Sequence, residues 1–255
     1  MQENTLLHFV SYGLQEVTLA FMVVVYIARL LWLFRFRAGR DLQAPTGRSS
    51  TGPFQGAAYS VAAVGMPWTM ESARTHLLYW LQFVVFHLGV VVTIALSLLV
   101  PYAPSALASQ IVIRLFQVLI GLGFLVGCYR MARRILDPAV RAVSSPDDYF
   151  ALGLLLAWFV SGWLVAGSHP AGGRPVAGQL AGDPSFLLIF FLIAAVFHVY
   201  VPFSKILHYL YYPFTRYYLG KTLGYRGVYP IERSHLPAKG RRTRQASSGT
   251  QAGEA

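Results

Sequence analysis

Long apolar stretches, separated by shorter polar segments, dominate this chain. Five of them are long enough to cross the hydrocarbon core of a bilayer, which takes about 20 residues of helix. They lie near residues 6–34, 76–100, 106–129, 149–167 and 186–212. The pattern therefore predicts an all-α integral membrane bundle of five transmembrane helices.

The remaining segments are polar and rich in turn-forming residues. Residues 35–75 carry many Gly, Pro and Ser, although their later part, AAYSVAAVGMPW, is apolar and could be an interfacial or re-entrant piece. Residues 168–184 have the composition of a turn-rich loop. The chain ends in a basic stretch of low complexity. We therefore expect a transmembrane domain over 1–220 and a basic, partly disordered tail over 221–255.

Composition agrees with a membrane protein and narrows its chemistry. The chain is 55% hydrophobic and only 12% charged, so we attribute its net charge of +11 to membrane topology and expect no nucleic-acid partner. The single cysteine, Cys128, excludes both a disulfide framework and a four-cysteine iron–sulfur site within the chain. The C-x-x-C-H pattern of covalently attached haem is also missing from the sequence.

The basic residues predict how the bundle is oriented. Segments 35–75 and 130–148, together with the residues from 205 onward, hold 18 of the 21 Lys and Arg residues. These segments share one side of an alternating five-span topology. The positive-inside rule then places the N-terminus outside and the C-terminus in the cytoplasm of a multi-pass protein of the cell inner (plasma) membrane.

Two pairs of histidines interrupt the apolar pattern, with His76 and His87 in the second predicted span and His198 and His208 in the fifth. An ionisable residue in a span is costly and is a functional-site hypothesis by default. The two spacings correspond to roughly 16 Å and 15 Å along a helix. In antiparallel spans His76 would face His208 and His87 would face His198. This arrangement suits the axial ligands of two b-type haems.

The fifth-span pair is about 80° away from sharing one helix face. Pro202 lies between its two histidines and predicts a kink that could correct this phase. The alternative is that the histidines are ordinary core residues. Zinc or another metal would usually bring carboxylates to the same level, and neither span has one beside its histidines.

Other charged residues are candidates for supporting roles. Four cations near the cytoplasmic haem level could bind its propionates or could simply anchor the spans at the membrane surface: Arg74, Arg130, Lys205 and Arg216. In the outer halves of the spans, Arg114 could hold a propionate or a quinone oxygen, and Glu16 could accept a proton from a quinol. These two could instead form a structural ion pair.

These features resemble the membrane cytochrome b family of the respiratory nitrate reductase gamma subunit, which includes related subunits of heterodisulfide reductase and of sulfite-reductase-associated complexes. The resemblance covers residues 1 to about 220 and rests on the five spans, the two histidine pairs and the string PFSKILHYLYYP (202–213). It implies two haem b groups. The cytoplasmic one would be ligated by His76 and His208, and the deeper one by His87 and His198.

The resemblance also implies a function. The chain would be the quinol-oxidising electron-transfer subunit of a respiratory oxidoreductase complex, exchanging electrons between the quinone pool and a cytoplasmic iron–sulfur subunit that carries the terminal active site. We expect that partner to dock on segments 35–75 and 213–236. Two alternatives stay open: a quinone-linked cytochrome b of a hydrogenase or formate dehydrogenase, and a haem-free membrane anchor or transporter subunit.

Overall fold

The computed structural model describes residues 2–36, 39, 42–45, 47, 51–69, 71–168 and 182–230, and within them it contains helices and no strand. The chain divides into two units. We call Met1–Gly39 with Met66–Thr215 the bundle unit, and Arg40–Gly65 with Arg216–Ala255 the small unit. The small unit therefore takes in residues from both sides of the boundary predicted at 220.

The bundle unit contains the five membrane-spanning helices, which confirms the predicted fold class for the part of the chain that the structure describes. The helices that are long and apolar enough to span a bilayer are Thr5–Phe34, Leu77–Tyr102, Gln110–Leu136, Pro146–Ser168 and Pro184–Phe203. The first of them joins α1 (Gln2–His8) and α2 (Leu14–Phe34) through a π-helical turn, Phe9–Gly13. The others are α5 (Leu77–Tyr102), α6 (Gln110–Leu136), α8 (Pro146–Ser168) and α9 (Pro184–Tyr200) with the turn that follows it. The sidedness of the bundle stays a prediction.

Local sequence explains where these helices begin. Asp183 is the N-cap of α9, where its carboxylate accepts hydrogen bonds from the first-turn amides, and Pro184 follows at the first helical position. Helix α8 also begins at a proline, Pro146, and carries Asp147 and Asp148 in its first turn. Carboxylates at this position compensate the positive end of the helix dipole.

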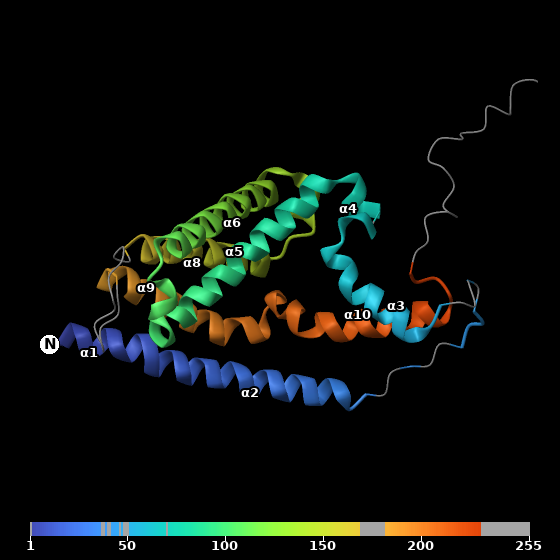
Figure 1. Ribbon diagram of the computed structural model, residues 1–255, viewed down its shortest axis with the longest axis horizontal. Helices are drawn as coiled ribbons and strands as arrows, with labels where there is room; N and C mark the ends of the chain where they lie inside the picture. The colour runs from blue at the N-terminus through green and yellow to red at the C-terminus, as the bar shows by residue number, and fades with distance from the viewer. Residues whose placement is uncertain are drawn as a thin grey trace, which may run out of the picture. The chain divides into compact units, whose positions relative to one another are not determined.

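The bundle packs through small residues and one buried ring. Helix α6 contacts both α5 and α8, and α9 contacts α2 and α8 (Figure 1). A Cβ atom added to Gly89 of α5 would lie 3.0 Å from the Cα atom of Gly123 of α6, so these two backbones nearly touch. Phe159 of α8 is fully buried and packs against both glycines. Small residues are what allow membrane helices to approach this closely.

The fifth predicted span, 186–212, is not one continuous helix. Helix α9 ends at Tyr200, and two 3₁₀ turns follow, Val201–Phe203 and Lys205–Leu207. A new helix, α10, then covers His208–Tyr225. The sequence predicted a kink at Pro202, and the structure has a full interruption there.

The interruption satisfies its own backbone groups. Pro202 has no N–H donor, so the α-helical hydrogen bond to the carbonyl of His198 cannot form. Ser204 lies between the two turns in an extended conformation, and its side chain accepts a hydrogen bond from the Ile206 amide at 3.1 Å. Its own amide donates to the Val201 carbonyl at 3.2 Å. These two hydrogen bonds at Ser204 give the break a defined structure.

Several other boundaries differ from the sequence predictions. Helix α5 begins at Leu77, which leaves His76 as its N-cap residue. The apolar segment AAYSVAAVGMPW forms the end of α3 (Pro53–Ala62) and two short 3₁₀ turns, followed by α4 (Glu71–Thr75). Of the segments predicted as a loop and a tail, residues 169–181 and 231–255 lie outside the described residues.

The small unit is built on a close contact between α3 and the last part of α10, which lie side by side (Figure 1). A Cβ atom added to Gly56 would collide with the carbonyl oxygen of Gly220 and would lie 2.5 Å from the Cα atom of Gly224. The Arg216 guanidinium adds a hydrogen bond of 3.1 Å to the Ser60 carbonyl. The sequence carries a G-x-x-x-G pattern on each side of this contact, Gly52–Gly56 and Gly220–Gly224. This pattern is typical of helices that approach each other closely.

We expect Gly56→Ala to separate α3 from α10, because the added methyl group meets backbone atoms that cannot rotate away. Overpacking of this kind costs typically about 1–3 kcal/mol. Hydrogen exchange should show faster exchange of the α3 amides. Gly65→Ala is the matched control, because nothing lies within 4 Å of its added Cβ atom. Equal exchange in the two variants would contradict the close contact.

Candidate functional site

The four candidate histidines occupy different environments. His87 in α5 and His198 in α9 are half-buried. His87 lies well inside its span, whereas His198 lies in the last turn of α9 and not in the middle of the span as the sequence had predicted. His76 and His208 are exposed and lie at helix starts, His76 as the N-cap of α5 and His208 as the first residue of α10. The ring of His76 lies 5.7 Å from that of Tyr79, one turn into its own helix.

The structure brings His87 and His208 together. Their ring centroids lie 6.4 Å apart with the planes at 87° to each other. The sequence predicted that His87 pairs with His198 and His76 with His208, because residues at the same level of two straight antiparallel spans face each other. The break at Pro202 instead redirects the chain before His208. His198 instead contacts α2, where Thr18 Oγ1 lies 3.0 Å from its Nδ1 atom.

Three of the four imidazoles are held through the same nitrogen. The Nδ1 atom of His87 lies 2.7 Å from the carbonyl oxygen of Phe83, and that of His208 lies 3.2 Å from the carbonyl oxygen of Lys205. A carbonyl can only accept, so both Nδ1 atoms carry the proton. The Thr18 hydroxyl donates to the Leu14 carbonyl at 2.8 Å, so it too accepts from His198. In each ring the Nε2 lone pair is therefore left for another partner, as in histidines that ligate metals.

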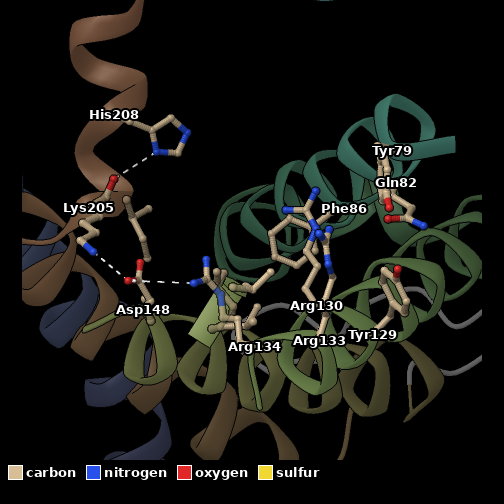
Figure 2. A pocket seen from close by; sticks show the side chains of 15 residues that line it. Tyr79, Gln82, Phe86, Tyr129, Arg130, Arg133, Arg134, Asp148, Lys205 and His208 are labelled. Atoms are coloured by element: carbon tan, nitrogen blue, oxygen red, sulfur yellow. Dashed lines mark hydrogen bonds and ion pairs between the residues drawn. The ribbon is translucent and has the colours of Figure 1, made fainter. Parts of the chain in front are cut away.

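A basic cavity of about 530 Å³ adjoins this pair. His208 lines it, together with residues of α5, α6 and α8 (Figure 2). Four basic side chains and one carboxylate are among the lining residues: Arg130, Arg133, Arg134, Lys205 and Asp148. Gln82, Tyr79 and Tyr129 add uncharged polar groups. The excess of positive charge makes this a site for a partly apolar ligand that carries negative charge.

The arginines of the cavity come from one face of α6, because residues at i, i+3 and i+4 are neighbours on a helix. The Arg130 guanidinium lies 4.8 Å from the centroid of the Phe86 ring, and that of Arg133 lies 5.4 Å from the Tyr79 ring. Figure 2 shows Arg130 and Arg133 beside Phe86. Arginine stacks favourably on aromatic faces and keeps its N–H groups available. Arg133 already pairs with the Asp137 carboxylate at 3.6 Å, whereas Arg130 has no carboxylate partner among the described residues and is placed to bind one.

The supporting residues expected from the sequence are only partly assembled here. Lys205 and Arg130 line the cavity. Arg74 lies in α4 and does not line it, and Arg216 belongs to the small unit. Three further charged residues that were not predicted from the sequence also line it: Arg133, Arg134 and Asp148. The 130, 133 and 134 spacing within one helix is the signal that could have identified the two arginines.

Arg114 and Glu16 do not form the ion pair considered from the sequence. The Arg114 guanidinium donates to Gln117 Oε1 at 3.0 Å, and a Glu16 carboxylate oxygen accepts from the Tyr102 hydroxyl at 3.4 Å. Arg114 and Gln117 instead line a second cavity between α6 and α8, of about 700 Å³. The other lining residues of this cavity are apolar or aromatic and include Trp163 and Phe159.

A contact between two aromatic rings links the two cavities. Phe159 lines the second cavity and Phe86 lines the first, and their ring centroids lie 5.7 Å apart in an edge-to-face arrangement. Both side chains are buried. An apolar ligand in the second cavity would therefore be separated from the basic cavity by these two side chains.

The first site brings two histidines and several basic side chains together, a donor set that a haem could use. The ring centroids of His87 and His208 lie 6.4 Å apart, and His208, although not His87, lines the basic cavity. Within the described part of the chain, no group of three or more His, Cys, Asp or Glu side chains could hold a bare metal ion. A two-histidine site suits a metal whose other ligands come from a porphyrin, and the arginines suit its propionates.

Comparison of this chain with protein-family models, with curated proteins and with solved structures finds no match.

The hydrogen bonds predict the protonation of the rings in the haem-free protein. Nitrogen-15 NMR of detergent-solubilised protein should find Nδ1 protonated and Nε2 unprotonated in His87 and His198. Thr18→Val removes the acceptor for His198 and should change its tautomer, while leaving that of His87 unchanged. Protonation of Nε2 in both rings of the unsubstituted protein would contradict this assignment.

Proposed function

We propose that this protein is a membrane cytochrome b subunit that exchanges electrons between a quinone and a cytoplasmic iron–sulfur partner of a respiratory oxidoreductase complex. The observation that carries the proposal is the His87–His208 pair beside a cavity rich in arginine. We further propose that the N-terminus lies outside, the C-terminus lies in the cytoplasm and the protein resides in the cell inner membrane, as the distribution of basic residues indicates.

Haem b, when bound, supplies a one-electron redox couple. The protein residues have three tasks in this proposal. His87 and His208 present Nε2 lone pairs, because their Nδ1 protons are engaged by backbone carbonyls. Arg130 and Arg133 bind carboxylates at the edge of the cavity. Leu152 and Leu155 give the cavity an apolar wall, and a lower local dielectric beside them would strengthen the interactions between charges there.

A second haem stays part of the proposal, with a weaker structural basis. The resemblance implies that all four histidines are ligands. If His87 and His208 form one pair, the remaining histidines are His76 and His198. His198 is prepared for ligation by its hydrogen bond to Thr18, whereas His76 is exposed at the start of α5. The geometry therefore supports the His87–His208 site first.

The second cavity supports the quinone half of the proposal. Its apolar walls suit an isoprenoid chain, and the Arg114 guanidinium and Gln117 amide offer donors for a quinone oxygen. The Phe159–Phe86 contact places this cavity next to the proposed haem site. Both cavities lie within the bundle unit.

The iron–sulfur partner is proposed because the chain itself provides no acceptor beyond a haem. Its single cysteine cannot bind a cluster that needs four thiolates. Segments 35–75 and 213–236 remain the proposed docking region, and parts of both belong to the small unit. A cytochrome b of a hydrogenase or formate dehydrogenase would share the haem chemistry but have a different partner. A haem-free anchor or transporter would lack the haem altogether.

We expect the purified protein to contain b-type haem, detected by pyridine haemochrome analysis. His87→Ala and His208→Ala should each remove the same haem, so redox titration should lose the same midpoint in both variants. His198→Ala tests the competing assignment. If His87→Ala and His198→Ala share a lost midpoint while His208→Ala loses another, the pairing by depth is correct and the pairing seen in the structure is wrong. A well-folded preparation without haem would refute the proposed function.

We expect Arg114→Gln to raise the KM for a soluble quinol analogue roughly tenfold or more while leaving haem content unchanged, because it removes a charged donor from the second cavity. Hydrogen bonds to charged groups contribute about 1.5–3 kcal/mol. Arg141→Gln is the matched control, because Arg141 lies in α7 (Pro138–Ala142) and lines neither cavity. An unchanged KM in Arg114→Gln would place the quinone elsewhere.

A further inference from the structure

The position of His208 depends on a short segment with little regular structure of its own. Residues 201–207 connect α9 to α10 through two 3₁₀ turns, which have poorer hydrogen-bond geometry than an α-helix. His208 follows immediately, and its Nδ1 atom donates to the carbonyl of Lys205 within that segment. Whatever fixes this segment therefore also fixes the imidazole of His208.

Two neighbouring carboxylates of α8 hold this segment, one on each side of Pro202. Asp147 accepts a hydrogen bond of 2.5 Å from the hydroxyl of Tyr200, the last residue of α9. Asp148 accepts one of 2.7 Å from the ammonium group of Lys205. Figure 2 shows Asp148 between Lys205 and Arg134, with His208 bonded to Lys205 on the other side. The first turn of α8 thus contacts the segment before and after Pro202.

Asp148 is itself firmly oriented. It accepts from the amide and the hydroxyl of Ser145, at 2.8 and 2.9 Å, and the Arg134 guanidinium lies 4.0 Å away. The Lys205 ammonium also donates to the Ser145 hydroxyl at 2.8 Å. The Asp148 side chain is only 14% exposed, although that of Lys205 is 59% exposed. Shielding and a fixed hydrogen-bond network distinguish this pair from an ordinary surface ion pair, which contributes little.

We propose that Asp147 and Asp148 are positioning residues for the His208 ligand. They clamp the 201–207 segment to the first turn of α8, and through the Lys205 backbone they set the location and ring orientation of His208. This inference rests on the proposed function, because the position of His208 matters only if His208 is a ligand. The clamp itself does not depend on any cofactor. It explains why two adjacent carboxylates occur where a membrane helix begins.

The alternative is that the carboxylates only stabilise the start of α8 through its dipole. The two explanations differ in what an uncharged side chain does. Asp148→Asn keeps a group that can accept the Ser145 amide but removes the charge that holds Lys205. A dipole role predicts effects at the start of α8 only. The clamp predicts effects in residues 201–207 and at His208.

The test uses the full-length protein in detergent and begins without haem. Hydrogen exchange should show faster exchange of the 201–207 amides in Asp148→Asn than in the unsubstituted protein. Asp183→Asn is the matched control, because Asp183 is also a carboxylate at the start of a span, but its partners are the amides of Ser185 and Phe186. That control should leave residues 201–207 unchanged.

The second readout uses the haem-loaded protein. Loss of a group bonded directly to a metal ligand typically lowers metal affinity roughly 10- to 100-fold. Asp148→Asn keeps the Lys205 carbonyl that His208 contacts, so we expect haem affinity to fall by about the lower end of that range. The low-spin EPR signal, which reports the angle between axial imidazole planes, should also change. Asp148→Glu should restore both properties at least in part. Lys205→Met should reproduce the effect, and the double variant Asp148→Asn with Lys205→Met should be no worse than either single variant.

The outcomes separate the clamp from the proposed function. If Asp148→Asn matches Asp183→Asn in the exchange of residues 201–207, in haem affinity and in EPR signal, the clamp is refuted while the haem site stands. If the unsubstituted protein never takes up haem, the proposed function fails, and the exchange experiment alone decides whether the clamp exists. If Asp148→Asn does not fold, Lys205→Met with normal exchange in residues 201–207 refutes the proposal.

Discussion

A proline within an apolar helix removes a hydrogen-bond donor that the interior of a membrane cannot replace with water. At Pro202 this constraint is met by two 3₁₀ turns around Ser204, whose side chain and amide satisfy the local backbone. The interruption ends α9 and restarts the chain as α10 at His208. The pairing of His208 with His87 follows from this redirection, and so does the dependence of His208 on contacts from α8.

The basic cavity adds a second constraint. Three arginines of α6 and Lys205 line the cavity with one carboxylate, Asp148, while Arg133 also pairs with Asp137. Arg130 and Arg133 lie over aromatic rings, which stabilises their charges. The remaining positive charge calls for an anionic ligand. In the proposed function, the propionates of a haem held by His87 and His208 would meet this need, so one ligand would bind both the histidines and the arginines.

The sequence predicted the features that depend on composition and on the length of apolar stretches. It did not predict the features that depend on how the helices pack in three dimensions. Five apolar stretches specified five spans, and Pro202 specified the place of an interruption. The partner of His87 could not be predicted by counting residues along straight helices, because two 3₁₀ turns replace part of the expected helix. The arginines at 133 and 134 were visible as a helix face, but their role depended on knowing that α5, α8 and His208 close the same cavity.

His198 is held by hydrogen bonding in an orientation suited to ligation, although it has no histidine partner among the described residues. It faces the first span, where a polar stripe begins with Ser11 in the π-helical turn and continues with Gln15 and Thr18 in α2. Gln15 is buried and donates to the carbonyls of Val10 and Phe191, which joins α2 to α9 one turn from Thr18. The stripe therefore fixes the contact that holds the Nδ1 proton of His198. Polar contacts between membrane helices fix the register of the helices as well as holding them together. Here a shift of one turn would leave Gln15 and His198 unpaired in an apolar surrounding, which is costly. The orientation of His198 is thus set by α2, whereas that of His208 is set by α8, and substitutions in these two helices should affect the two histidines separately.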